Sequence, residues 1–148
     1  MKIIATNKRA TYDYNISLKF DAGLILTGSE VKSLRKNSSS IKESYIEGIK
    51  NELWLCNCFI KKYEASNEKD NNPTRKRKLL LNKKELNKLL GLVKKDGFSI
   101  VPMIIYFNDK GFAKLNLGLG KGKKKYDKRE TQKLRDWNKK KQQLLKKT

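Results

Sequence analysis

Hydrophobic and polar residues alternate with a period of two in several short stretches of the chain. The stretches are Tyr14–Phe20, Gly23–Thr27, Ser44–Glu47, Leu53–Ile60, Ile100–Phe107 and Phe112–Leu119. Because successive side chains of a strand point to opposite faces, this pattern predicts about six strands, enough for a small barrel or sandwich. The segments Asp21–Gly23 and Asn108–Gly111 suit hairpin turns. Pro102 predicts a sheet edge or a bulge.

Two helices interrupt the alternation. The first, Ser29–Lys36, is short and places Val31 and Leu34 on one face. The second begins after Asn82, which is spaced to form a capping box with Glu85. Its apolar stripe is Leu86, Leu89, Leu90 and Val93. Gly97 is the predicted stop.

The last 28 residues differ from the rest in composition. Lys121–Thr148 carries 13 Lys and Arg against three acidic residues, so it holds +10 of the net +21 of the 148-residue chain. So few apolar residues cannot offset the entropy of ordering, and the segment is expected to be disordered in free solution. Asp127 and Glu130 are spaced as a capping box for a helix from Lys128, which we expect to form on contact with RNA. The predicted division is a body, 1–120, and a basic tail, 121–148.

Charge and aromatic residues together indicate an RNA partner. Cations stand beside tyrosines at Arg9–Tyr14, Lys61–Tyr63 and Lys123–Tyr126, and phosphates attract cations while unpaired bases stack on rings. An AT-rich genome would explain the preference for Lys over Arg but not the excess of positive charge. The polar segment Ala65–Lys78 is predicted to be a loop whose cations, Arg75–Lys78, contact phosphates.

Several other classes of protein are disfavoured. No run of about 18 apolar residues predicts a membrane span, and no secretory leader is present, so a cytoplasmic protein is expected. The chain has no His, no P-loop and no nucleophile elbow, which indicates a protein that is not an enzyme and needs no metal or cofactor. Cys56 and Cys58 are expected to be buried thiols on one strand face. A magnesium-dependent nuclease using scattered carboxylates stays open as an alternative.

Four strings in order along the chain resemble the small protein B, or SsrA-binding protein, family. They are NKRATYDY (Asn7–Tyr14), GLILTGSEVKSLR (Gly23–Arg35), NPTRKRKLLLNKKEL (Asn72–Leu86) and GLGKGKKKYDKRE (Gly118–Glu130). The resemblance implies a mainly β fold: an OB-like closed antiparallel barrel of about six strands, with two to three packed helices and a disordered basic tail. It implies no enzymatic activity.

The resemblance also implies the partners. Members bind the tRNA-like domain of transfer-messenger RNA (tmRNA) and, with elongation factor Tu acting through that RNA, bring it to stalled ribosomes. Their tail enters the decoding centre of the small subunit and the empty mRNA channel. A monomer is expected. A basic structural ribosomal protein remains the alternative on composition alone.

The site residues implied by the resemblance form two sets. On the body they are Asp21, Glu30, Lys32, Arg35, Leu80 and Asn82. Asp21 could instead stabilise a turn, Leu80 could be a core residue, and Asn82 could serve as a helix cap. In the tail they are Gly122, Lys123, Lys124, Tyr126, Asp127, Lys128, Arg129, Leu144 and Leu145. Many members have His where this chain has Tyr126, and a phenol ring also stacks on a base.

Overall fold

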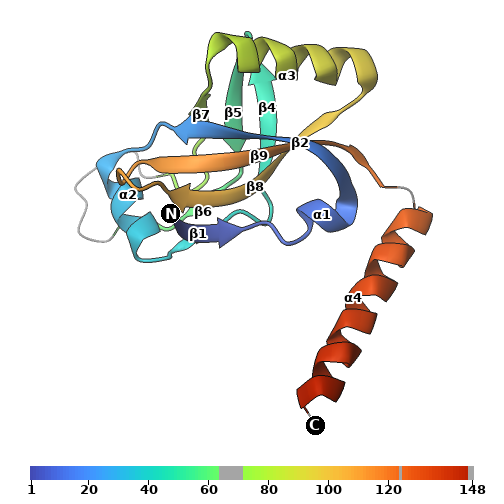
Figure 1. Cartoon of the computed structure of the whole chain (residues 1–148). Helices are drawn as coiled ribbons and strands as arrows, with labels where there is room; N and C mark the ends of the chain where they lie inside the picture. Colours follow the sequence, from blue (N-terminus) through green and yellow to red (C-terminus); the bar gives the residue numbers. More distant parts are fainter. Residues whose placement is uncertain (64–71, 124, 147–148) are drawn as a thin grey trace.

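The structure is a computed structural model that describes residues 1–63, 72–123 and 125–146 (Figure 1). The strands are β1 Lys2–Thr6, β2 Tyr14–Leu24, β3 Ser39–Ser40, β4 Tyr45–Ile49, β5 Glu52–Cys56, β6 Phe59–Ile60, β7 Arg77–Leu80, β8 Ser99–Phe107 and β9 Ala113–Gly122. The helices are α1 Ala10–Asp13, α2 Gly28–Arg35, α3 Lys83–Asp96 and α4 Lys125–Lys146. The fold is mainly β, as the alternation predicts.

Seven strands form one antiparallel sheet in the order β1-β8-β9-β2-β7-β5-β4, and β3 pairs separately with β6. The predicted closed barrel is not confirmed, because no ladder among the described residues joins β4 to β1 or β8. β1 pairs only with the second half of β8, from Ile104 to Phe107. Two hollows of about 480 and 310 Å³ lie between the unpaired half of β8 and β4, and both are lined by Tyr14, Tyr45 and Ile100.

Strand boundaries depart from the prediction at two places. Asp21–Gly23 does not turn: β2 continues through it, paired with β9 as far as Gly23 opposite Lys114. The predicted strand Leu53–Ile60 is broken at Asn57, whose φ of 54° is incompatible with a strand. The turn after Phe107 is confirmed by Gly111, which has a φ of 83°. A bulge follows Pro102, also as predicted.

β7 lies where a loop was predicted. Residues 64–71 of that segment are outside the described residues, but its end, Arg77–Lys78, pairs with β5, and Leu79 and Leu80 pair with β2. Arg77 and Leu79 point into the core and are 0% and 4% exposed. A cation run conceals this alternation, because a buried arginine counts as polar in any hydrophobic pattern.

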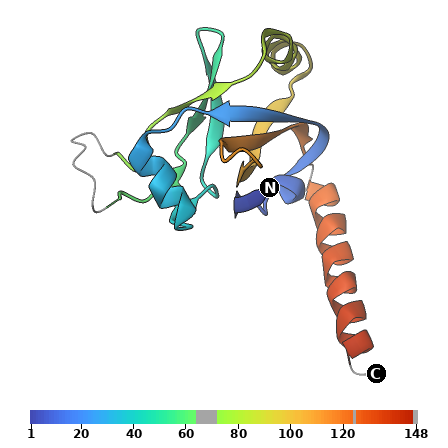
Figure 2. The ribbon, with the colours of Figure 1, turned by 60° about the vertical axis from the view of Figure 1, so that its left-hand side comes forward.

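Three helices pack against the sheet. Thr27 caps α2 in a capping box with Glu30, and Leu34 of α2 is fully buried. Asn82 caps α3 as predicted: its Oδ1 accepts the Glu85 backbone N–H at 2.8 Å, and Gly97 ends the helix in the left-handed region. Figures 1 and 2 show α2 and α3 against different parts of the sheet. Ala10 of the short helix α1 is also buried.

Residues Lys125–Lys146 of the tail are helical, and the sequence predicts a helix there on contact with RNA. α4 runs from Lys125 to Lys146, starting three residues before the predicted Lys128, and extends away from the body (Figures 1 and 2). The segment contains no Gly or Pro and is rich in Lys, Arg, Gln and Leu, which favour helices. Gln132 and Asp136 add a hydrogen bond of 3.1 Å between successive turns.

Both cysteines are buried free thiols, as predicted. They do not share a strand face, since the break at Asn57 separates them. Burial raises the pKa of the Cys58 thiol to about 11.

No group of three or more potential metal ligands occurs within the described ranges. In the same part of the chain, no helix has the length and hydrophobicity to cross a membrane.

Candidate RNA-binding surface

The outward face of the large sheet is continuous across four strands. The strand register places Tyr106 of β8 opposite Lys114 of β9, Lys114 opposite Gly23 of β2, and Gly23 opposite Leu80 of β7. The alternate residues, such as Ala22, point into the core. At Gly23 an added Cβ would lie 3.3 Å from the Leu80 Cβ, so the absence of a side chain at Gly23 leaves room for Leu80.

Asp21 lies one row further along the same face, opposite Asn116. The Asn116 Nδ2 donates a hydrogen bond of 3.0 Å to Asp21 Oδ1, and the Tyr106 hydroxyl lies near the Asp21 carboxylate. The pKa of Tyr106 is raised by partial burial and by this carboxylate. The Asp21 side chain is nevertheless exposed. Its predicted alternative role, in a turn, is wrong because β2 does not turn there.

Leu80 lies on the same face as Asp21, opposite Gly23, and Asn82 follows it at the start of α3. Leu80 is 52% exposed, which excludes the alternative that it is a core residue. Asn82 follows two residues later and caps α3, so the cap role anticipated for it is real. The structure thus brings two of the six predicted body residues, Asp21 and Leu80, to one face of the sheet.

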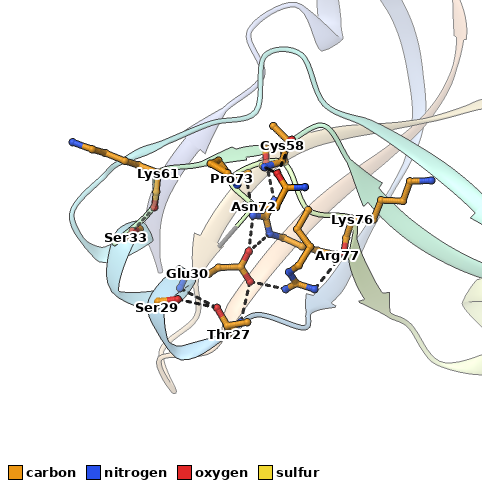
Figure 3. A network of polar contacts seen from close by, with 12 residues as sticks. Thr27, Ser29, Glu30, Ser33, Cys58, Lys61, Asn72, Pro73, Lys76 and Arg77 are labelled. Atoms are coloured by element: carbon orange, nitrogen blue, oxygen red, sulfur yellow. Dashed lines mark hydrogen bonds and ion pairs between the residues drawn. The ribbon is translucent and has the colours of Figure 1, made fainter. Parts of the chain in front are cut away.

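Glu30, unlike Asp21, has a largely buried carboxylate that is bound by arginines of the body (Figure 3). Its carboxylate accepts hydrogen bonds from Arg77 Nε at 2.5 Å and Arg75 Nη2 at 2.6 Å, and its residue is only 7% exposed. Arg77 also donates to the carbonyl oxygens of Cys58 and Pro73. Burial alone would raise the pKa of Glu30, but the bonds from Arg75, the Thr27 backbone and Arg77 outweigh it and hold the pKa below its usual value. Glu30 therefore joins α2 to β7.

The other two predicted residues of α2 are exposed but lie away from Asp21. Lys32 stands 5.5 Å from the centre of the Tyr63 ring, and the Arg35 guanidinium stands 5.9 Å from that of Phe107. Sequence order placed them in one string with Glu30, but the structure gives the three residues different environments.

The structure corrects the role predicted for the cation run Arg75–Lys78, which was expected to lie in a loop and contact phosphates. Each of its four members pairs with a carboxylate: Arg75 and Arg77 with Glu30, Lys76 with Glu47 at 3.1 Å, and Lys78 with Glu52 at 3.2 Å. Arg77 is fully buried. These pairs stabilise the fold, and of the four cations the partly exposed Arg75, Lys76 and Lys78 keep solvent-accessible charge for a phosphate.

The predicted tail residues begin at the other end of β2 from Asp21. Gly122 closes β9 opposite Tyr14, and the Lys123 backbone N–H donates to the Asp13 carbonyl at 2.8 Å. Lys124 lies outside the described residues, as do the side chains of Tyr126, Asp127 and Lys128. Arg129 is exposed. Leu144 and Leu145 are 63% and 73% exposed and share α4 with the equally exposed Leu134 and Trp137.

Tyr106 and Asn116 were not predicted as site residues from the sequence. Both sit in strands that were predicted, but their contact with Asp21 depends on which strands are neighbours and in what register. Alternation within one strand carries no information on either, so no local signal could have identified them.

Comparison with known proteins now identifies the family. The model of the family described as "SmpB protein" matches residues 4–147. The chain belongs to the SmpB family. Among SmpB relatives named "SsrA-binding protein", that of Ehrlichia ruminantium (strain Gardel) is 53% identical over 145 residues, covering 98% of each chain. That of Wolbachia pipientis subsp. Culex pipiens is 50% identical over 146 residues, covering 99% of this chain and 98% of the relative.

A solved SmpB structure matches as well. It is described as "tmRNA-SmpB: a journey to the center of the bacterial ribosome" and shares 44% sequence identity at a TM-score of 0.65. The match covers 84% of this chain and 91% of that one. The large antiparallel sheet with its helices is thus the SmpB fold.

Proposed function

We propose that this chain binds the tRNA-like domain of tmRNA and delivers it to stalled ribosomes for trans-translation. The observation that carries the proposal is the match over nearly the whole chain to proteins named for SsrA binding, joined by a structure named for tmRNA, SmpB and the ribosome. Such a protein acts in the cytoplasm without chemistry of its own, and elongation factor Tu joins it indirectly, through the RNA. The net charge of +21 fits a polyanionic partner.

The body, residues 1–120, supplies an OB-like platform for the tRNA-like domain in this proposal. Asp21, Leu80 and Asn82 form its centre: Asp21 and Leu80 share one exposed face of the sheet, and Asn82 is an exposed residue two positions after Leu80. Glu30 acts on this surface only through β7, by way of its buried bond to Arg77. Lys32 and Arg35 are available to phosphates on a different part of the surface.

The tail, residues 121–148, reads the empty decoding centre and mRNA channel in this proposal. Gly122–Lys124 and Asp127–Arg129 correspond to the strings through which the family is accommodated on the ribosome. Tyr126 supplies a ring that stacks on a base, and Leu144 and Leu145 rest against the channel. Replacing Tyr126 by Ala should depress peptide tagging while Tyr126→His preserves it. Equal tagging by all three proteins would contradict the stacking role.

The decisive experiment is competition at physiological salt between labelled tRNA-like domain and excess ordinary tRNA. If ordinary tRNA competes poorly, recognition exceeds what net charge provides, and the proposal stands. If both RNAs compete equally, charge alone explains binding and a structural ribosomal protein becomes the better account. Washing ribosomes in high salt is the companion test, because a delivery factor is released whereas a structural protein stays bound.

A further inference from the structure

We infer that Tyr106 and Asn116 are positioning residues that hold the Asp21 carboxylate ready to accept a hydrogen bond from a donor group of the bound RNA. The inference rests on the proposed function and deepens it. It assigns a role to two side chains from β8 and β9, strands that contribute none of the predicted RNA-binding residues of the body.

The geometry fixes Asp21 from two sides. Asn116 stands directly opposite it in the ladder, and its Nδ2 reaches both Asp21 Oδ1 at 3.0 Å and the Phe20 carbonyl at 3.4 Å. The second bond orients the Asn116 amide, which in turn orients the carboxylate. On β8, across β9, the Tyr106 hydroxyl lies near the same carboxylate, which helps to raise the pKa of Tyr106. Three adjacent strands therefore converge on one exposed acidic group.

The backbone ladder does not need these bonds. β2 and β9 are paired from Tyr14–Gly122 to Gly23–Lys114, and β9 and β8 along most of their length. A side-chain link on the solvent side of such a sheet adds little to its register. The link instead restricts the rotamer of Asp21 while leaving that residue exposed.

Charge identifies the kind of group that Asp21 meets. A carboxylate repels phosphate, so an acidic side chain within an RNA interface must face donors, namely the amino or imino groups of bases or a 2′-hydroxyl. An ionised carboxylate has about four acceptor sites, of which Asn116 occupies one. The remaining sites point to solvent, already oriented, so binding loses less side-chain entropy.

The test uses the full-length chain and measures its affinity for the tRNA-like domain. Tyr106→Phe removes only the hydroxyl, and Asn116→Ala removes the amide. Each is expected to weaken binding about three- to tenfold, the effect of one intramolecular hydrogen bond. Tyr45→Phe, an exposed tyrosine of β4 away from this face, is the matched control and should bind as the parent does. Thermal unfolding midpoints establish that each variant is folded.

A second arm shows whether the effect passes through Asp21. In an Asp21→Ala background, Tyr106→Phe and Asn116→Ala should have no further effect on affinity. The inference is overturned if they weaken binding equally in both backgrounds, or if neither weakens binding in the parent. Failure of the proposed function is distinguishable, because the parent protein itself would then fail to prefer the tRNA-like domain over ordinary tRNA.

Discussion

At the scale of single residues, Arg77 is the charge on which the body depends most. It is 0% exposed, bound to the Glu30 carboxylate and to two carbonyl oxygens. Arg77→Ala leaves the buried Glu30 with Arg75 alone and removes a donor from the Cys58 and Pro73 carbonyls, so it should lower the free energy of unfolding by about 3–5 kcal/mol. Urea denaturation measures this change. Lys76→Ala, in the neighbouring exposed pair with Glu47, is the control and should change stability far less. Equal stability of the two variants would contradict the structural role of Arg77.

Glu30 gives the body a pH dependence at the acid end. Since its pKa in the folded state lies below the ordinary 4.5, the ionised form stabilises the fold above that pH. The stabilisation is lost as the pH falls through the folded-state pKa. The stability difference between the parent and Glu30→Gln should therefore be largest near neutral pH and shrink below about pH 4.5. Denaturation at several pH values tests this, and a difference that stays constant into the acid range would exclude Glu30 as the titrating group.

At the scale of elements, the start of α3 combines a structural and a proposed binding role in Asn82. Its side-chain oxygen caps the helix, so Asn82→Ala should cost about 0.5–2 kcal/mol of stability. Asn82→Ser keeps a capping oxygen but loses the amide, and should leave stability nearly unchanged. If the amide contacts RNA, Asn82→Ser should still weaken binding to the tRNA-like domain. Unchanged affinity in a stable Asn82→Ser protein would assign Asn82 to the cap alone.

The elements also show which features a sequence can reveal. α3 was predicted from its cap to Gly97 because its signals, a cap residue, an apolar stripe and a glycine, all lie within the helix itself. β7 was missed because the burial of Arg77 depends on Glu30, 47 residues away. The grouping of Asp21, Leu80 and Asn82 followed from family resemblance and not from the pattern, while Tyr106 and Asn116 depended on register. Sequence therefore predicts local elements well, and contacts between them poorly.

At the scale of the whole molecule, the proposed function divides the charge between a body that discriminates among RNAs and a tail that does not. Deleting Lys121–Thr148 removes +10 of the net +21, so the affinity for any RNA should fall and depend less steeply on salt. Each lost phosphate contact should reduce the log–log slope by about 0.7–0.9. Asp21, Leu80 and Asn82 stay in place, so the truncated protein should still prefer the tRNA-like domain over tRNA while supporting no tagging. Salt titrations with both RNAs, beside a tagging assay, separate these effects.

A full-length variant with Leu144→Ala and Leu145→Ala is the matched control for the deletion. It keeps every charge of the tail but removes two exposed apolar residues of α4, 63% and 73% accessible in the free chain. Its salt dependence should equal that of the parent, because counterion release follows charge alone. Its tagging should fall, because Leu144 and Leu145 are proposed to rest against the mRNA channel. If the deletion abolishes the preference for the tRNA-like domain, recognition is shared between body and tail, and the division of labour proposed for them is wrong.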